Sequence, residues 1–150
     1  MENAAFRARA HYFIETFGSK VLSQFTKLIY SFEANDSPKR AEIGNDFAAA
    51  VEKELEPLLA DASPYFGGKD KLTLVEVDTG SFLLRFEALA SKEAGYIVPK
   101  EAFEKISALK NFDTWRKAVV ANESVTGIWD RETFIVNTLK RLAARAQPTK

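Results

Sequence analysis

Apolar residues recur at steps of three and four along the first 32 positions of the chain. The stripe comprises Phe6, Ala10, Phe13, Phe17, Val21, Phe25, Leu28 and Phe32. Because an α-helix completes a turn in 3.6 residues, side chains at this spacing share one face. The pattern therefore predicts a long amphipathic helix from Ala4 to about Phe32.

A second stripe follows a turn-forming stretch, Asn35-Asp36-Ser37-Pro38. Ser37 is suited to the N-cap of a helix, with Pro38 at its first position. The apolar residues that follow at helical spacing are Ile43, Phe47, Val51, Leu55 and Leu58. Pro57 either kinks the last turn of this helix or ends it near Glu56, because proline lacks the N–H that a helix interior needs.

Three shorter helices are expected in the last third of the chain. One covers residues 99–106 and begins at a proline. Asn111 can cap a helix over residues 112–120, and Asp130 can cap a last helix over residues 131–146. The residues expected to face inward are Phe112, Trp115, Val119, Ile135, Leu139 and Leu142.

The stretch at residues 67–86, GGKDKLTLVEVDTGSFLLRF, fits two secondary structures. Its first half alternates like a strand, but a lone strand among helices has no partner for its backbone groups. As a helix it gains a capping box, in which Thr73 and Glu76 bind each other's backbone amides, and a hydrophobic staple between Leu72 and Val77. The residues that follow are apolar nearly all round, so we expect the central, buried helix of the domain here.

These elements predict a single domain over residues 1–150, an all-α bundle of about six helices. The 150 residues are 46% hydrophobic, enough for a proper core. The 21 basic and 21 acidic residues cancel, so no nucleic-acid partner is expected. The chain has no cysteine and one histidine, which argues against disulfides, thiolate chemistry and a metal site. With no long apolar run or secretory signal, we expect no membrane partner and a cytoplasmic location.

One motif resembles a known family. Phe66-Gly-Gly-x-x-x-Leu72-Thr-Leu-x-Glu76-Val, continuing to Phe82-Leu-Leu-Arg85, is similar to the C-terminal helical domain of glutathione transferases, and most of all to fungal, omega-like members. In that family a Ser/Thr-x-x-Asp/Glu box with a staple nucleates the central helix. The stretches 111–115 (NFDTW) and 122–125 (NESV) resemble the family's penultimate helix. The similarity spans residues 5 to 145, with Ser81 where many relatives have a proline.

The resemblance implies that half of the protein lies elsewhere. Family members bind glutathione in an N-terminal thioredoxin-like domain, which also supplies the catalytic Tyr, Ser or Cys. This chain shows no such pattern, so it is either a truncated piece or a natural single-domain offshoot. It would then hold no catalytic residue and no cofactor, with glutathione as the co-substrate of the full-length parent. A thioredoxin-like domain, another partner protein or a homodimer would cover its surface.

By position in that family, the first helix supplies the electrophile pocket, with Arg9, Tyr12, Phe13 and Thr16 on one side of it. Arg9 could bind a carboxylate through paired hydrogen bonds, and the two aromatic rings could stack on a flat substrate. Thr16 could instead bond the carbonyl one turn back. The alternative is that Phe13 belongs to the core stripe and Arg9 to a solvated face.

Other polar residues have plainer interpretations. Asp78 and Arg85, two turns apart, are expected to form a buried pair or separate bonds to neighbouring loops, because a lone buried charge is costly. His11 lacks a nearby partner for general-base chemistry. Trp115 and Trp129 are expected in the core or at an interface.

Two rival functions remain for the same fold, because fold does not fix function. One is a non-catalytic protein-interaction module of the kind found in translation factors and tRNA-synthetase complexes. The other is a small-molecule carrier that uses a cleft between helices. Exposed apolar surface would point to a lost partner, whereas a bound apolar ligand would point to a carrier.

Overall fold

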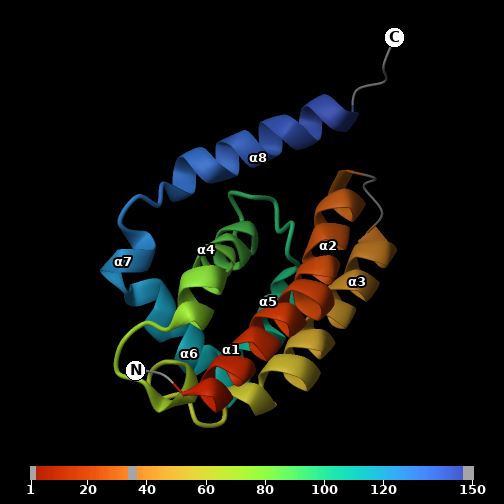
Figure 1. Ribbon diagram of the computed structural model, residues 1–150. Helices are drawn as coiled ribbons and strands as arrows, with labels where there is room; N and C mark the ends of the chain where they lie inside the picture. The colour runs from red at the N-terminus through yellow and green to blue at the C-terminus, as the bar shows by residue number, and fades with distance from the viewer. Residues whose placement is uncertain (1–2, 34–36, 147–150) are drawn as a thin grey trace.

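The computed structural model describes residues 3–33 and 37–146, and this part of the chain is helical without a strand. The α-helices are α1 (Ala4–Thr16), α2 (Ser23–Glu33), α3 (Ser37–Ala50), α4 (Leu74–Leu89), α5 (Lys100–Ser107), α6 (Lys110–Ala121), α7 (Glu123–Thr126) and α8 (Arg131–Ala146). The nearest approach to a sheet is an isolated bridge between Tyr65 and Lys69. The expected all-α class is confirmed (Figure 1).

All six expected helices are found in the described residues, and the one-turn α7 is additional. Asn122 caps α7 by accepting a hydrogen bond from the amide of Ser124 at 2.9 Å. A helix of four residues is too short for apolar periodicity to reveal it, which is why the sequence pattern missed it.

The first expected helix is continuous but not uniform. α1 passes into a π-helical segment, η1 (Phe17–Leu22), and η1 passes into α2. Every member of its apolar stripe from Phe6 to Leu28 is buried, as predicted. The side chain of Phe32 lies outside the described part.

The second expected helix also changes its winding near its end. α3 leads into a π segment, η2 (Val51–Leu55), and then into a 3₁₀ turn, η3 (Pro57–Leu59). Pro57 therefore ends the wider helix at Glu56 rather than kinking it. The change of winding buries Leu59 instead of the expected Leu58, which is only half-buried. The predicted turn at residues 35 and 36 lies outside the described residues.

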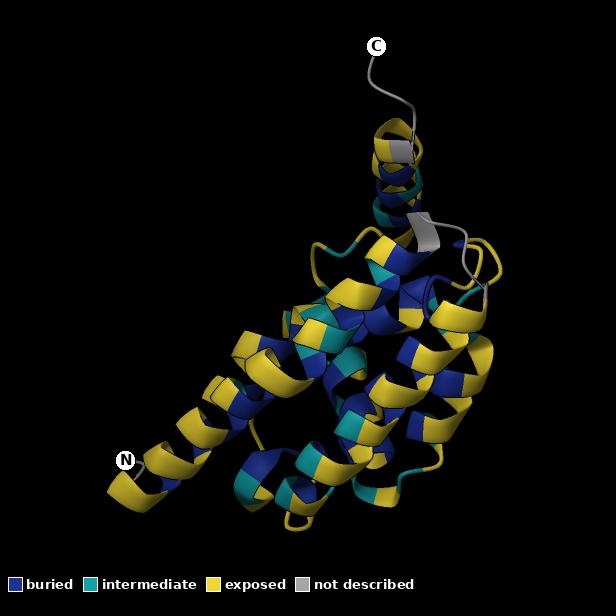
Figure 2. Ribbon diagram, turned by 90° about the vertical axis from the view of Figure 1, so that its right-hand side faces the viewer, coloured by how far each residue is buried: buried dark blue, intermediate teal, exposed yellow. Residues whose placement is uncertain are grey.

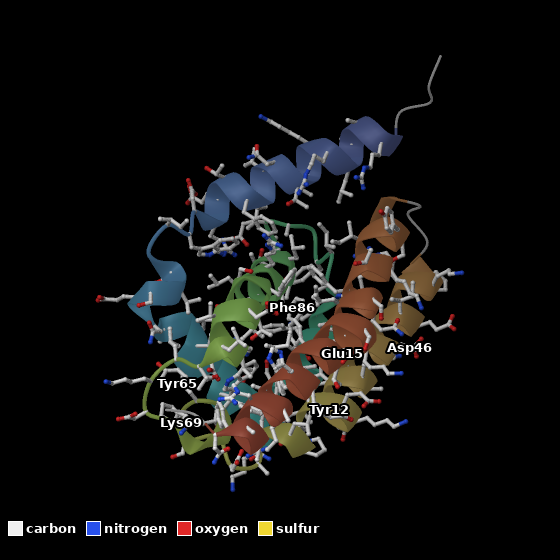
Figure 3. All side chains as sticks on the ribbon, in the orientation of Figure 1. Tyr12, Glu15, Asp46, Tyr65, Lys69 and Phe86 are labelled. Atoms are coloured by element: carbon white, nitrogen blue, oxygen red, sulfur yellow. The ribbon has the colours of Figure 1, made fainter. Side chains whose placement is uncertain are left out.

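Aromatic side chains fill the core between the helices. Phe86 of α4 lies in the interior between α4 and α2 (Figure 3). Its ring centroid is 4.7 Å from that of Phe25 and 5.2 Å from that of Phe47, both in edge-to-face geometry. Lower in the bundle, Phe13 meets Trp115 edge to face at 5.5 Å. Figure 2 shows the result, with buried residues on the inner sides of the helices and exposed ones outside.

The start of α6 corrects one prediction. Asn111 does not cap it; α6 begins at Lys110 after Leu109, whose side chain makes no capping bond. The carboxylate of Glu56, in the turn between η2 and η3, caps α6 instead: it accepts hydrogen bonds from the amides of Asn111 at 2.8 Å and Phe112 at 2.7 Å. A helix N-terminus leaves amides unpaired, and an acidic group also suits its positive end.

α8 crosses one end of the bundle and covers only part of α4 (Figure 1). It contacts the C-terminal halves of α2 and α4. Leu84 and Ala88, in that half of α4, are buried. The first half of α4 keeps one face open to solvent, and Val77 is exposed on it. The sequence pattern instead predicts a helix buried nearly all round. α4 is central, but it is not buried all round.

Candidate functional site

The motif residues of α4 meet at a buried carboxylate. Glu76 is fully buried, and its two oxygens accept four hydrogen bonds. Oε2 receives the amide of Thr73 at 2.8 Å and the hydroxyl of Thr73 at 2.6 Å. Oε1 receives the amide of Phe66 at 2.8 Å and Nε1 of Trp115 at 2.7 Å. A buried carboxylate needs such partners, because burial strips it of water.

The capping box that the sequence predicts is present. Thr73 has extended backbone geometry, its side chain accepts from the first turn of α4, and Glu76 accepts from the amide of Thr73. The contacts to Phe66 and Trp115 were not visible in the sequence, because they join segments 10 and 39 residues away from Glu76. The same carboxylate thus starts α4 and fixes it to α6.

The loop before α4 depends on a glycine. Gly67 has a φ of +68°, a left-handed conformation that favours glycine. A Cβ added there would lie 2.5 Å from Cε2 of Phe6 on α1. The ring of Phe6 also packs edge to face on Phe66 at 5.8 Å. The loop that donates to Glu76 is therefore held closely against the start of α1.

The expected staple leaves one partner in solvent. Leu72 is half-buried and packs against the core, whereas Val77 is 70% exposed. The side chain of Leu74 is also exposed, at 47%. Leu74 and Val77 are three residues apart and so lie on one side of the helix. They form an apolar face on the first turns of α4, which we call the Leu74–Val77 face.

The four candidate residues of α1 have different surroundings. Phe13 is fully buried in the core and Thr16 nearly so. Arg9 is half exposed and forms an ion pair with Asp61 at 3.0 Å, while its guanidinium lies 5.2 Å from the ring centroid of Phe66. Tyr12 is 58% exposed on the outer side of α1 (Figure 3). The cavities described below are lined by other residues.

Neither expected arrangement of Asp78 and Arg85 is found: within the described residues their side chains form no ion pair with each other and no hydrogen bond to a neighbouring loop. Asp78 is exposed on the open face of α4. Arg85 is half-buried and has no ion pair with any described residue. His11 is exposed, Trp115 is a core residue, and Trp129 is half-buried with its ring 5.1 Å from that of Phe134.

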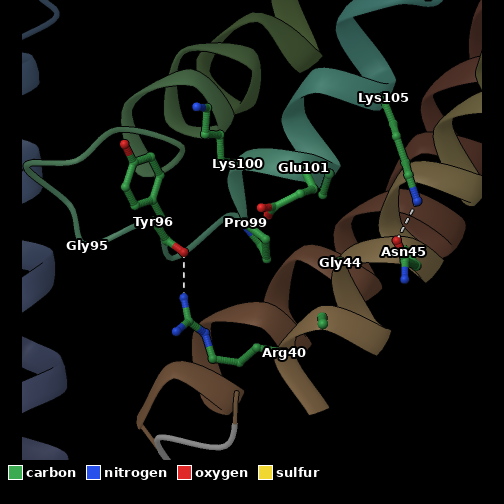
Figure 4. Close-up of a pocket in the computed structure, with 11 residues that line it drawn as sticks. Arg40, Gly44, Asn45, Gly95, Tyr96, Pro99, Lys100, Glu101 and Lys105 are labelled. Atoms are coloured by element: carbon green, nitrogen blue, oxygen red, sulfur yellow. Dashed lines mark hydrogen bonds between the residues drawn. The ribbon is translucent and has the colours of Figure 1, made fainter. Parts of the chain in front are cut away.

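A cavity of about 710 Å³ lies between α3 and α5 (Figure 4). Gly44 of α3 faces Pro99 there, so closely that an added Cβ would lie 3.0 Å from the proline ring. Its charged lining residues are three basic ones, Arg40, Lys100 and Lys105, and one acidic one, Glu101. The opposite rim is the loop at Tyr96, which has a positive φ of 53°.

The polar groups of this cavity already bind one another. Arg40 donates to the carbonyl oxygen of Tyr96, and Nζ of Lys105 donates to Oδ1 of Asn45 at 2.6 Å. Burial lowers the pKa of Arg40 from its ordinary value. The first contact joins the start of α3 to the loop before α5, and the second joins the middle of α3 to α5 itself. The cavity has an excess of basic lining residues, but Arg40 and Lys105 already donate hydrogen bonds within the fold.

Comparisons with known proteins give no assignment: no family model, curated protein or solved structure matches the chain. In the described residues no group of three His, Cys, Asp or Glu side chains is placed to hold a metal ion. None of the described helices is both long and apolar enough to cross a bilayer. The described part of the chain is an all-helical bundle in which the buried carboxylate of Glu76 joins α4, α6 and the loop before α4.

Proposed function

We propose that this chain is the helical half of a glutathione-transferase-like protein, which docks against a thioredoxin-like domain and holds an electrophile beside its glutathione. The support is the Leu74–Val77 face, which overlaps the capping box formed by Thr73 and Glu76. An exposed apolar face on the central helix of a bundle is typical of a surface that a partner covers. The motif residues and this face belong to the same two turns of α4.

In this proposal the chain contributes positioning and the partner contributes the activated thiol. Of the four candidate residues on α1, Arg9 and Tyr12 reach solvent, and Phe13 and Thr16 support the helix from within. Contact with the electrophile therefore falls to the aromatic ring of Tyr12. Arg9 would have to exchange its ion pair with Asp61 for the carboxylate of a ligand.

Docking can be tested with the purified chain and the separate thioredoxin-like domain of a glutathione transferase. We expect association by sedimentation, weakened about tenfold or more by Val77→Glu, because a charge would be buried at the contact. Val136→Glu is the matched control, since Val136 is exposed on α8, away from the Leu74–Val77 face. Equal effects of the two variants, or no association at all, would contradict the proposal.

Activity separates this function from its rival. Association together with glutathione conjugation of an aromatic electrophile supports the transferase half, and Tyr12→Ala should then slow the conjugation. Association without conjugation favours the non-catalytic interaction module, which would use the same face. Calorimetry of the chain alone with reduced glutathione should show no binding; binding that Arg9→Gln abolishes would place a glutathione site on α1.

A further inference from the structure

A second cavity, of about 360 Å³, lies between α2, α4 and α8. α8 crosses the ends of the other two helices at this point (Figure 1). Three arginines line the cavity, Arg85 from α4 and Arg141 and Arg145 from α8, and none of its lining residues is acidic. The cavity therefore concentrates positive charge in a chain whose net charge is zero.

Arg85 is held in place by aromatic rings rather than by a carboxylate. Its guanidinium carbon lies 5.0 Å from the ring centroid of Phe82 and 5.9 Å from that of Phe134. Its Nε is buried without a hydrogen-bond partner. Neither Arg85 nor Arg141 has an ion pair with any residue of the described chain. Stacking between rings fixes a guanidinium and leaves its donors available for a planar anion.

Thr138 of α8 gives a second, independent observation. It is 4% exposed and lines the cavity, and its Oγ1 has no hydrogen-bond partner. A threonine in a helix commonly donates to the carbonyl one turn back, as Thr79 does to Val75 at 2.7 Å. Thr138 does not. A buried hydroxyl without a partner destabilises a fold, and such a group is understandable where a ligand supplies the partner.

The remaining walls are mostly apolar and come from all three helices. They include Phe25, Ile29, Leu89, Phe134 and Leu142. Two further lining residues contact each other: the guanidinium of Arg145 lies 5.8 Å from the ring centroid of Tyr30. The volume is at the lower end of the range for small-molecule sites, about 300–1,000 Å³. A ligand that matches this lining has one anionic end and a compact apolar body.

We propose that this cavity binds a small organic acid. Arg85 and Arg141 hold its carboxylate, because the guanidinium fork matches the two oxygens of a carboxylate in distance and plane. Thr138 donates its hydroxyl to the same carboxylate or to a neighbouring oxygen. The apolar body of the acid packs between α2 and α4, out of water. The site is independent of the Leu74–Val77 face, so it stands or falls separately from the transferase proposal.

Calorimetric titration of the whole chain with naphthoate tests the proposal, with naphthalenemethanol as the neutral probe of the same shape. We expect naphthoate to bind about tenfold or more tightly than the alcohol, because charge-assisted hydrogen bonds are lost with the carboxylate. Arg85→Met and Arg141→Gln should each weaken naphthoate binding to a similar extent. Lys140→Gln removes one positive charge from the same helix outside the cavity, and should change the affinity by less than about twofold.

Thr138→Val separates a ligand site from a structural one. We expect it to weaken naphthoate binding several-fold while the melting temperature of the free protein stays the same or rises. Equal affinity for both probes, no binding of naphthoate at millimolar concentration, or equal losses in Lys140→Gln and Arg141→Gln would overturn the proposal. Arg141 is exposed, so its variant folds even if Arg85→Met does not.

Discussion

Trp115 of α6 donates a hydrogen bond from its indole nitrogen to Oε1 of Glu76 on α4, at 2.7 Å, and both side chains are fully buried. With the donors from Phe66 and Thr73, the carboxylate reaches the four hydrogen bonds that its two oxygens can accept. A buried acid with this many donors is a structural centre, since each donor would lose its partner if Glu76 were replaced.

We predict that Glu76→Gln lowers the free energy of unfolding by about 2–4 kcal/mol. The amide nitrogen of glutamine is a donor, so it cannot satisfy the donors that meet one of the carboxylate oxygens. Urea unfolding followed by Trp fluorescence measures the change. Glu104→Gln is the control, because the Glu104 side chain is exposed and its carboxylate has only a loose ion pair with Lys100, at 3.8 Å, among the described residues. A similar loss in both variants would contradict the role of Glu76.

We predict that Glu56→Ala destabilises the start of α6 by about 1–2 kcal/mol, the usual effect of losing a helix cap. The amides of Asn111 and Phe112 lose their acceptor and should exchange with solvent faster. Hydrogen exchange followed by NMR measures this at both positions. Asn111→Ala is the comparison: a larger effect there than in Glu56→Ala would restore Asn111 as the cap.

We predict opposite effects for two glycine-to-alanine changes. Gly67→Ala should lower stability by about 1–3 kcal/mol, because its positive φ and the nearby ring of Phe6 both oppose a side chain. Gly18→Ala should raise stability by about 0.5–1 kcal/mol, since Gly18 is helical and has open space around it. Thermal unfolding of the two variants side by side checks the sign of each change.

We predict a stability change in acid from Asp113. Partial burial by itself would raise the pKa of Asp113, but hydrogen bonds from Lys117 and Arg116, together with their charges, hold its pKa below the ordinary value. Because the folded pKa is the lower one, the stabilisation is fully present above about pH 4 and is lost as the pH falls through the folded pKa. Urea unfolding between pH 7 and pH 2 should show this loss.

Asp113→Asn provides the reference for that measurement. At pH 7 it should be less stable than the parent by about 1–3 kcal/mol, because Arg116, which is also buried, loses a charged partner at 2.7 Å. The difference between the two proteins should shrink at the acid end. Parallel curves over the whole range would show that Asp113 does not contribute through its charge.

The helices follow from the sequence because their signals are local. The stripe from Phe6 to Leu28 repeats with the period of a helix, and Thr73 and Glu76 bind within a single turn. Asp130 likewise caps α8 through the amide of Thr133, as its position predicts. The sequence pattern did not predict α7, because a helix of one turn is too short for apolar residues to recur at helical spacing.

The sites depend on contacts between distant segments, which a single sequence does not display. Glu56 caps α6 from 55 residues away, and Trp115 reaches Glu76 across 39 residues. Arg85 pairs with two aromatic rings instead of Asp78, because α8 brings Phe134 over α4. Periodicity and capping act over one turn of the backbone, so the sequence by itself determined the helices. Their packing alone decided which polar groups meet a partner, which are left without one beside a cavity, and which face of α4 stays open.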